Sequence, residues 1–100
     1  MDMTKGKIVT LVLVNGAEIV GRHVQRTPDG VTLNRPRMVQ ATPQGVGLVN
    51  GISMTGVEPK GDFTFPTNSI MYTIDTVEEI ANGWTSQTSG LALPQKGLLS

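Results

Sequence analysis

An Asn-Gly pair between two apolar runs constrains the folding of this 100-residue chain more than any other feature. The run before it, residues 7–14 (KIVTLVLV), is rich in β-branched side chains and too short for a convincing helix, which predicts a strand. Asn15-Gly16 is the strongest short-range hairpin signal, because a type I′ turn needs positive φ at both positions. The chain is therefore expected to return antiparallel over residues 17–26.

Alternating apolar residues between turn signals predict five short strands in total. The predicted strands are residues 7–14, 17–26, 31–38, 45–54 and 69–75. Proline and glycine mark the turn at residues 27–30 (TPDG), and a surface loop is predicted at residues 56–62. Pro36 predicts an edge, a bulge or a bend in the third strand, because proline donates no ladder hydrogen bond.

Gly21 stands inside the second predicted strand, where a packing side chain would be expected. Glycine weakens a strand, but it permits a tight bend or a close approach of a neighbouring backbone. Five short antiparallel strands in a meander must bend sharply to form a small barrel. The sequence therefore predicts a mostly β fold, a small and strongly bent antiparallel open barrel, with Gly21 as its structural bend.

A short helix is predicted after the last strand. Glu78 and Glu79 lie near its expected N-terminus, where acidic side chains suit the helix dipole, and Gly83 is placed to end it. We divide the chain into an N-terminal lead, the β-barrel, the short helix and a flexible tail. The predicted boundaries are 1–6, 7–75, 76–84 and 85–100.

Composition and charge exclude several classes of protein. The absence of cysteine excludes disulfides and thiolate metal sites. No apolar run approaches the length of a membrane span, so we expect a cytoplasmic protein with no membrane partner. The first half of the sequence contains six Lys and Arg residues and three acidic residues, a net charge of +3. The second half contains two Lys residues and five acidic residues, a net charge of −3. Such a split could hold neighbouring copies together or leave a basic face for a polyanion.

His23, the only histidine, is the one candidate for acid–base chemistry. Its position differs from that of Glu18 by five, an odd number, so the two side chains should point to opposite faces of a strand. The sequence has no second histidine and no carboxylate pair at metal-ligand spacing. We therefore predict no catalytic residue, no metal, no cofactor and no enzyme activity.

Two motifs in the predicted barrel resemble the signatures of the Sm and Sm-like (LSm) family. The residues that resemble the first signature are Leu13, Asn15, Gly16, Ile19, Gly21, Val31 and Leu33. Residues 65–74 (FPTNSIMYTI) are similar to the second, which has an aliphatic residue, a short turn and an isoleucine-led last strand. The resemblance covers residues 7–37 and 63–75. Within the family, the chain resembles a divergent phage-type Sm-like protein.

The resemblance implies an SH3-type barrel that assembles into a ring. In the family, the fourth and fifth strands pair with those of neighbours, and many rings bind single-stranded RNA around the lumen. For this chain it implies a homo-oligomer of roughly five to seven subunits, in which residues 69–75 pair with residues 45–54 of the next copy. The predicted interface residues are Ile70, Met71, Tyr72 and Ile74.

Three departures from the family pattern concern its N-terminus and its nucleotide contacts. Residues 1–6 are too short for the usual N-terminal helix. Gly30 stands where the family has an asparagine that contacts a base, and Pro66-Thr67 stands where it has Arg-Gly. These changes favour the alternative function, a structural or assembly ring without a nucleic-acid ligand.

The predicted RNA site consists of two loops that the resemblance places at the lumen. Its residues are Arg26, Asp29, Gly30, Thr67 and Asn68. A further basic patch is predicted on the strands, because arginine contacts phosphates and stacks on bases. Its residues are Arg22, Arg35 and Arg37. The alternatives for these arginines are a solvated face, or salt bridges to Glu78 and Glu79 of a neighbouring copy.

Overall fold

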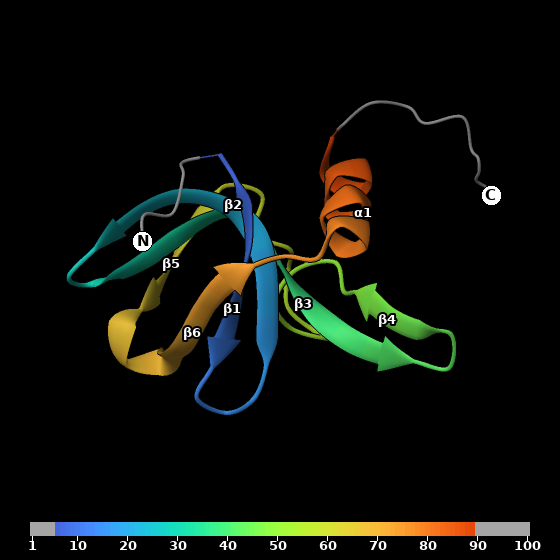
Figure 1. The fold of residues 1–100 in the computed structure, drawn as a ribbon, viewed down its shortest axis with the longest axis horizontal. Helices are drawn as coiled ribbons and strands as arrows, with labels where there is room; N and C mark the ends of the chain where they lie inside the picture. The colour runs from blue at the N-terminus through green and yellow to red at the C-terminus, as the bar shows by residue number, and fades with distance from the viewer. Residues whose placement is uncertain (1–5, 90–100) are drawn as a thin grey trace.

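The fold of the chain is known from a computed structural model, which describes residues 6–89. It is mostly β, with an antiparallel sheet that is not closed and one short C-terminal helix (Figure 1). The predicted fold class, compatible with a small bent barrel, is confirmed. Most of the predicted lead, and the predicted tail beyond residue 89, lie outside the described residues.

The elements follow one another along the chain with short connections, apart from the segment between the fourth and fifth strands. In chain order they are β1 (Ile8–Leu13), β2 (Glu18–Thr27), β3 (Gly30–Thr42), β4 (Gly45–Leu48), β5 (Asp62–Pro66), the 3-10 helix η1 (Thr67–Ser69), β6 (Ile70–Asp75) and α1 (Glu78–Thr88).

The main sheet has the strand order β6-β1-β2-β3-β5, and every pairing in it is antiparallel. β4 pairs with the far end of β3 and forms a hairpin that projects from one side of the sheet, beside α1 (Figure 1). β5 and β6 are therefore the two outer strands of the main sheet. Among the described residues, each has a strand partner on one side only.

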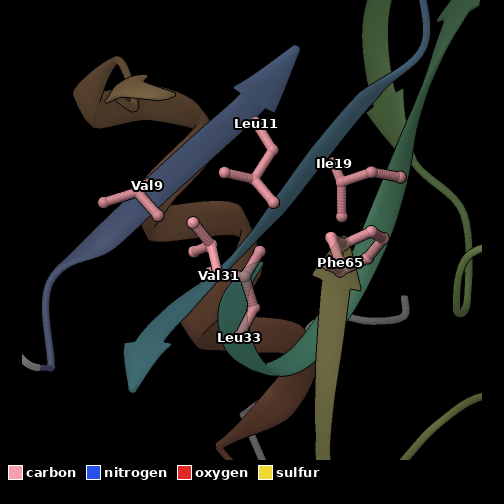
Figure 2. Packing of buried hydrophobic residues seen from close by; sticks show 6 residues of the cluster. All are labelled: Val9, Leu11, Ile19, Val31, Leu33 and Phe65. Atoms are coloured by element: carbon pink, nitrogen blue, oxygen red, sulfur yellow. The ribbon is translucent and has the colours of Figure 1, made fainter. Parts of the chain in front are cut away.

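The core is built from alternate residues of four strands, whose side chains gather between those strands (Figure 2). Its members are Val9, Leu11, Ile19, Val31, Leu33 and Phe65. Each is at most 6% exposed. With a single aromatic ring in this cluster, the core is modest, and the fold depends on close backbone approach as well as on side-chain burial.

Gly21 lies in β2 directly against β3. A Cβ atom at this position would lie 3.0 Å from the Leu33 Cβ and 3.2 Å from the Asn34 carbonyl oxygen. The β2–β3 register also shifts between Val20 and Arg22, so the ladder is irregular at this glycine. A small residue is needed here because the facing strand occupies the space, as the sequence pattern indicates.

Pro36 lies where β3 exchanges one partner for another. Residues 30–34 pair with β5, and residues 39–42 pair with β4. Between them, Arg35 has a positive φ of 49°, an uncommon conformation for a residue other than glycine, and Pro36 is buried. The interruption predicted at Pro36 is thus the junction between the two pairings of one long strand.

The predicted fourth strand is wrong in its extent, and one strand was missed. β4 ends at Leu48 instead of residue 54, because Gly51 adopts a positive φ of 109° and its carbonyl accepts a hydrogen bond from the Met38 amide. Residues 62–66 form β5, which the alternating Phe63 and Phe65 could have indicated. This strand forms because Phe65 is buried in the core beside the long β3.

The predicted end of the helix is also wrong. α1 runs to Thr88 and passes through Gly83, so residues 85–88 are helical instead of belonging to a tail. Trp84 and Thr88 are its two buried residues, one turn apart, and the Thr88 hydroxyl donates to the Trp84 carbonyl. Burial of this face outweighs the roughly 1 kcal/mol cost of a glycine inside a helix.

Candidate functional site

The two loops of the predicted RNA site lie together at one end of the sheet. The Thr67 amide donates to the Asp29 carbonyl (3.0 Å), and the Thr67 hydroxyl donates to the Pro28 carbonyl (2.9 Å). These bonds hold η1 against the β2–β3 turn, although the two loops are about forty residues apart in sequence. The turn residues therefore have a structural role, whatever else they contact.

A hollow of about 370 Å³ opens beside these loops. It lies between the end of the β2–β3 hairpin and β6. The lining residues are Arg26, Thr27, Pro28, Val31, Thr67, Ile70, Met71, Tyr72 and Thr73. Its volume falls within the range of small-ligand pockets, and it combines a cation, hydroxyl groups and an aromatic ring.

Tyr72 supplies the aromatic ring of this hollow. The sequence analysis assigned it only to the ring interface, as it did Ile70 and Met71, which also line the hollow. Tyr72 is 58% exposed, and β6 carries it into the lining that also contains Arg26. The loops themselves contain no aromatic residue, so a search of the loops alone could not find the aromatic side chain of Tyr72. The pairing of β6 with β1 brings it there, and no local sequence signal reports that pairing.

The other predicted site residues lie around the hollow instead of in its lining. Asp29 and Asn68 are exposed at the tips of their turns. Gly30 is buried, and a Cβ atom at this position would overlap the Phe65 carbonyl oxygen. Gly30 therefore serves the close contact between β3 and β5, which explains why a residue with a side chain cannot occupy this position.

The predicted basic patch contacts the protein itself. Arg37 is only 3% exposed, and its Nη2 donates to Glu58 Oε2 at 2.5 Å. Its Nη1 donates to the Asn50 and Gln87 side-chain oxygens, at 2.7 and 2.8 Å. Arg35 Nη2 donates to the same Glu58 oxygen at 3.3 Å. Within the chain, the carboxylate partner of Arg35 and Arg37 is thus Glu58.

Trp84 connects this cluster to the helix. Its Nε1 donates to the Arg35 carbonyl at 2.9 Å, and Arg35 Nη1 donates to the Thr88 carbonyl at 2.7 Å. The Arg22 guanidinium lies 5.2 Å from the centre of the indole ring, within the range of a cation–π contact. Arg22, Arg35 and Arg37 therefore anchor α1 and the segment 49–61 to the sheet, and Arg26 is left as the arginine that lines the hollow.

His23 is buried, at 4% exposure, and neither ring nitrogen has a hydrogen-bond partner among the described residues. Burial lowers the pKa of His23, and the positive charge of Arg26 lowers it further. The neutral imidazole is therefore the form that fits this site. Among residues 6–89, no three His, Cys, Asp or Glu side chains come together as metal ligands would.

Stability should fall as the pH drops, because the unfolded chain binds a proton at His23 more readily than the folded chain. The unfolded pKa is about 6.5, and the folded pKa lies below it. The loss therefore begins as the pH falls through the unfolded pKa and continues toward the folded pKa. The urea midpoint should be lower at about pH 5.5 than at about pH 7.5, and His23→Leu should flatten this dependence. Parallel curves for the two proteins would contradict the assignment.

The outer strands present apolar side chains to solvent along an unpaired edge. Met71, Tyr72 and Ile74 of β6 are 49%, 58% and 51% exposed, whereas Ile70 is half-buried. Phe63 of β5 is 39% exposed and packs against Phe65 at 4.8 Å between ring centres. Exposed apolar edge strands are templates for pairing with another chain.

No helix among the described residues is both long enough and apolar enough to cross a membrane. Comparison of the sequence with protein-family models finds no match, and comparison with curated proteins finds none.

Proposed function

We propose that the chain is a cytoplasmic Sm-like protein that assembles into a homo-oligomeric ring. The ring binds single-stranded RNA, and the binding site on each copy lies beside Arg26. The observation that carries the proposal is the hollow of about 370 Å³ lined by residues 70–73 of β6, a strand that pairs only with β1 among the described residues. A neighbouring copy paired to that edge would form the outer wall of the hollow. Assembly and binding would then involve the same surface.

The proposed assembly pairs β6 of one copy with β5 of the next. These are the two outer strands of the main sheet, so head-to-tail pairing continues the sheet from copy to copy. The sequence resemblance pointed to residues 45–54 as the partner, but β4 lies outside the main sheet and pairs only with the end of β3. β5 is the better partner because it ends beside η1 and the hollow.

The proposed RNA contacts follow from the chemistry of the lining. Arg26 supplies a charge for phosphate and a plane that stacks on a base. Tyr72 supplies an aromatic face, which single-strand binding sites use without regard to base identity. Asn68, exposed beside the hollow, can both donate to and accept from a base edge.

Titration of labelled oligo-uridine and oligo-adenine at low and high salt tests this proposal. Binding should weaken as salt rises, because phosphate contacts release counterions. Arg26→Ala should weaken binding of both oligomers by about tenfold, the effect of losing roughly 1.4 kcal/mol. Lys7→Ala is the matched control, since it removes an equal charge from an exposed side chain that does not line the hollow.

Two further variants separate stacking from base recognition. Tyr72→Leu keeps an apolar side chain on the β6 edge but removes the ring, so it should weaken both oligomers while leaving assembly intact. Asn68→Ala should mainly reduce the difference between uridine and adenine. Absence of binding at low salt by a ring that assembles normally would contradict the RNA proposal.

A structural ring without a nucleic-acid ligand is the second candidate. It is favoured by the arrangement of Arg35 and Arg37, whose guanidinium groups are committed to Glu58, Asn50 and Gln87 inside the fold. Only Arg26, of the four arginines considered from the sequence, lines the hollow. In this function, side chains of the neighbouring copy would fill the hollow.

A further inference from the structure

A second concave surface lies between α1 and the β3–β4 hairpin, away from the loops that form the hollow. Two adjoining cavities of about 210 and 220 Å³ share Val46 and Ile80 and together form a furrow along the helix. Aliphatic side chains are the largest group in its lining. The aliphatic residues are Val20, Val39, Val46, Leu48, Ile74, Val77 and Ile80.

The charged residues of the furrow are all acidic. Glu18, Asp75 and Glu79 line it, and no Lys or Arg does. Asp75 pairs with Lys7 at 3.0 Å, whereas neither glutamate has an ion-pair partner within residues 6–89. The furrow therefore suits an aliphatic segment that carries a positive charge.

The segment 56–61 (GVEPKG) of this chain has that chemistry. Val57 is 94% exposed, and Lys60 is exposed with no ion pair among the described residues. Glu58, between them, is held inward by Arg35 and Arg37. This anchor fixes the segment to the protein while its valine and lysine face outward.

The proposed strand pairing brings this segment close to the furrow of the next copy. In an antiparallel β6–β5 pair, the end of β6, near Asp75, lies toward the start of the neighbour's β5, near Asp62. Val57 precedes Asp62 by five residues, which span at most about 17 Å. The furrow begins at the end of β6, where Ile74 and Val77 line it.

We propose that the segment 56–61 of each copy docks into the furrow of the adjacent copy. Val57 lies among the aliphatic side chains, and Lys60 lies against Glu18 and Glu79. This inference rests on the proposed ring, and it adds a second contact that selects one register of edge pairing. Charge complementarity at such a contact favours the correct partner over alternatives.

Disulfide trapping tests the docking, and no native cysteine can form a competing disulfide because the chain contains none. A protein carrying Val57→Cys is mixed with one carrying Val46→Cys under mild oxidation. A covalent dimer should form only in the mixture, because the two side chains meet only across the contact between copies. Val14→Cys, at an exposed valine outside the furrow, is the control and should form no dimer with Val57→Cys.

A charge exchange tests the same contact independently. Lys60→Glu and Glu79→Lys should each weaken assembly by about tenfold, and the two changes together should restore it. Glu78→Lys is the matched control, because Glu78 lies in the same helical turn but does not line the furrow.

The two proposals fail in different ways. An oligomer that forms no mixed disulfide and is insensitive to the charge exchange would overturn the docking and leave the ring standing. A protein that sediments as a monomer would overturn the ring and the docking with it. A disulfide within one chain that carries both Val46→Cys and Leu98→Cys would assign the furrow to the chain's own C-terminal segment, which would also overturn the docking.

Discussion

Replacing Trp84 with alanine is expected to lower the free energy of unfolding by about 3–5 kcal/mol. Trp84 is 1% exposed and is one of two buried residues in α1. Its removal also takes away the donor to the Arg35 carbonyl and the ring beside Arg22. Because a small domain has only about 5–15 kcal/mol of stability in all, the loss is a large fraction of the total.

The helix itself should melt in the Trp84→Ala protein. α1 has 11 residues, and helices of this length are marginal in water without tertiary packing. Far-ultraviolet circular dichroism during a urea titration, at fixed protein concentration, measures both effects. Asn82→Ala, an exposed change in the same helix, should shift stability by no more than about 0.5 kcal/mol. Similar curves for the two variants would show that Trp84 does not anchor the helix.

Gly30→Ala is expected to destabilise the protein by about 1–3 kcal/mol, although it adds only one methyl group. The added Cβ would overlap the Phe65 carbonyl oxygen, which belongs to the backbone of β5. Relief requires β5 to move away from β3, and that movement disturbs the pairing of Val31 with Phe65 in the core.

Gly61→Ala is the matched control for Gly30→Ala. A Cβ atom at Gly61 would meet no atom within 4 Å, and its φ is not in the left-handed region. This change should be nearly neutral, or slightly stabilising through the unfolded state. Equal effects of the two substitutions on the urea midpoint would contradict the close approach of β3 and β5.

The fold class could be predicted because its local signals agree. The Asn15-Gly16 turn, the β-branched run before it and Gly21 each indicate a bent antiparallel sheet, and the structure contains it. The helix end could not be predicted, since Gly83 is a reasonable stop signal by itself. The burial of Trp84 against Arg35 decides where the helix ends, and that contact joins residues 49 positions apart.

The candidate site was predictable only in part, for the same reason. Sequence motifs indicated both loops, and hydrogen bonds from Thr67 hold them together. The position of Tyr72 in the hollow depends on the pairing of β6 with β1, which no short motif reports. The partner of Arg35 and Arg37 was missed because Glu58 lies in a glycine-rich segment without regular structure, where spacing carries no information about faces.

The mass of the unmodified protein in solution tests the central claim most directly. Both candidate functions need β6 of one copy to pair with β5 of the next, and so does the docking of segment 56–61. Light scattering at micromolar concentration should give a single species of roughly five to seven copies of the 10.7 kDa chain. A mass equal to one chain over that concentration range would contradict the account.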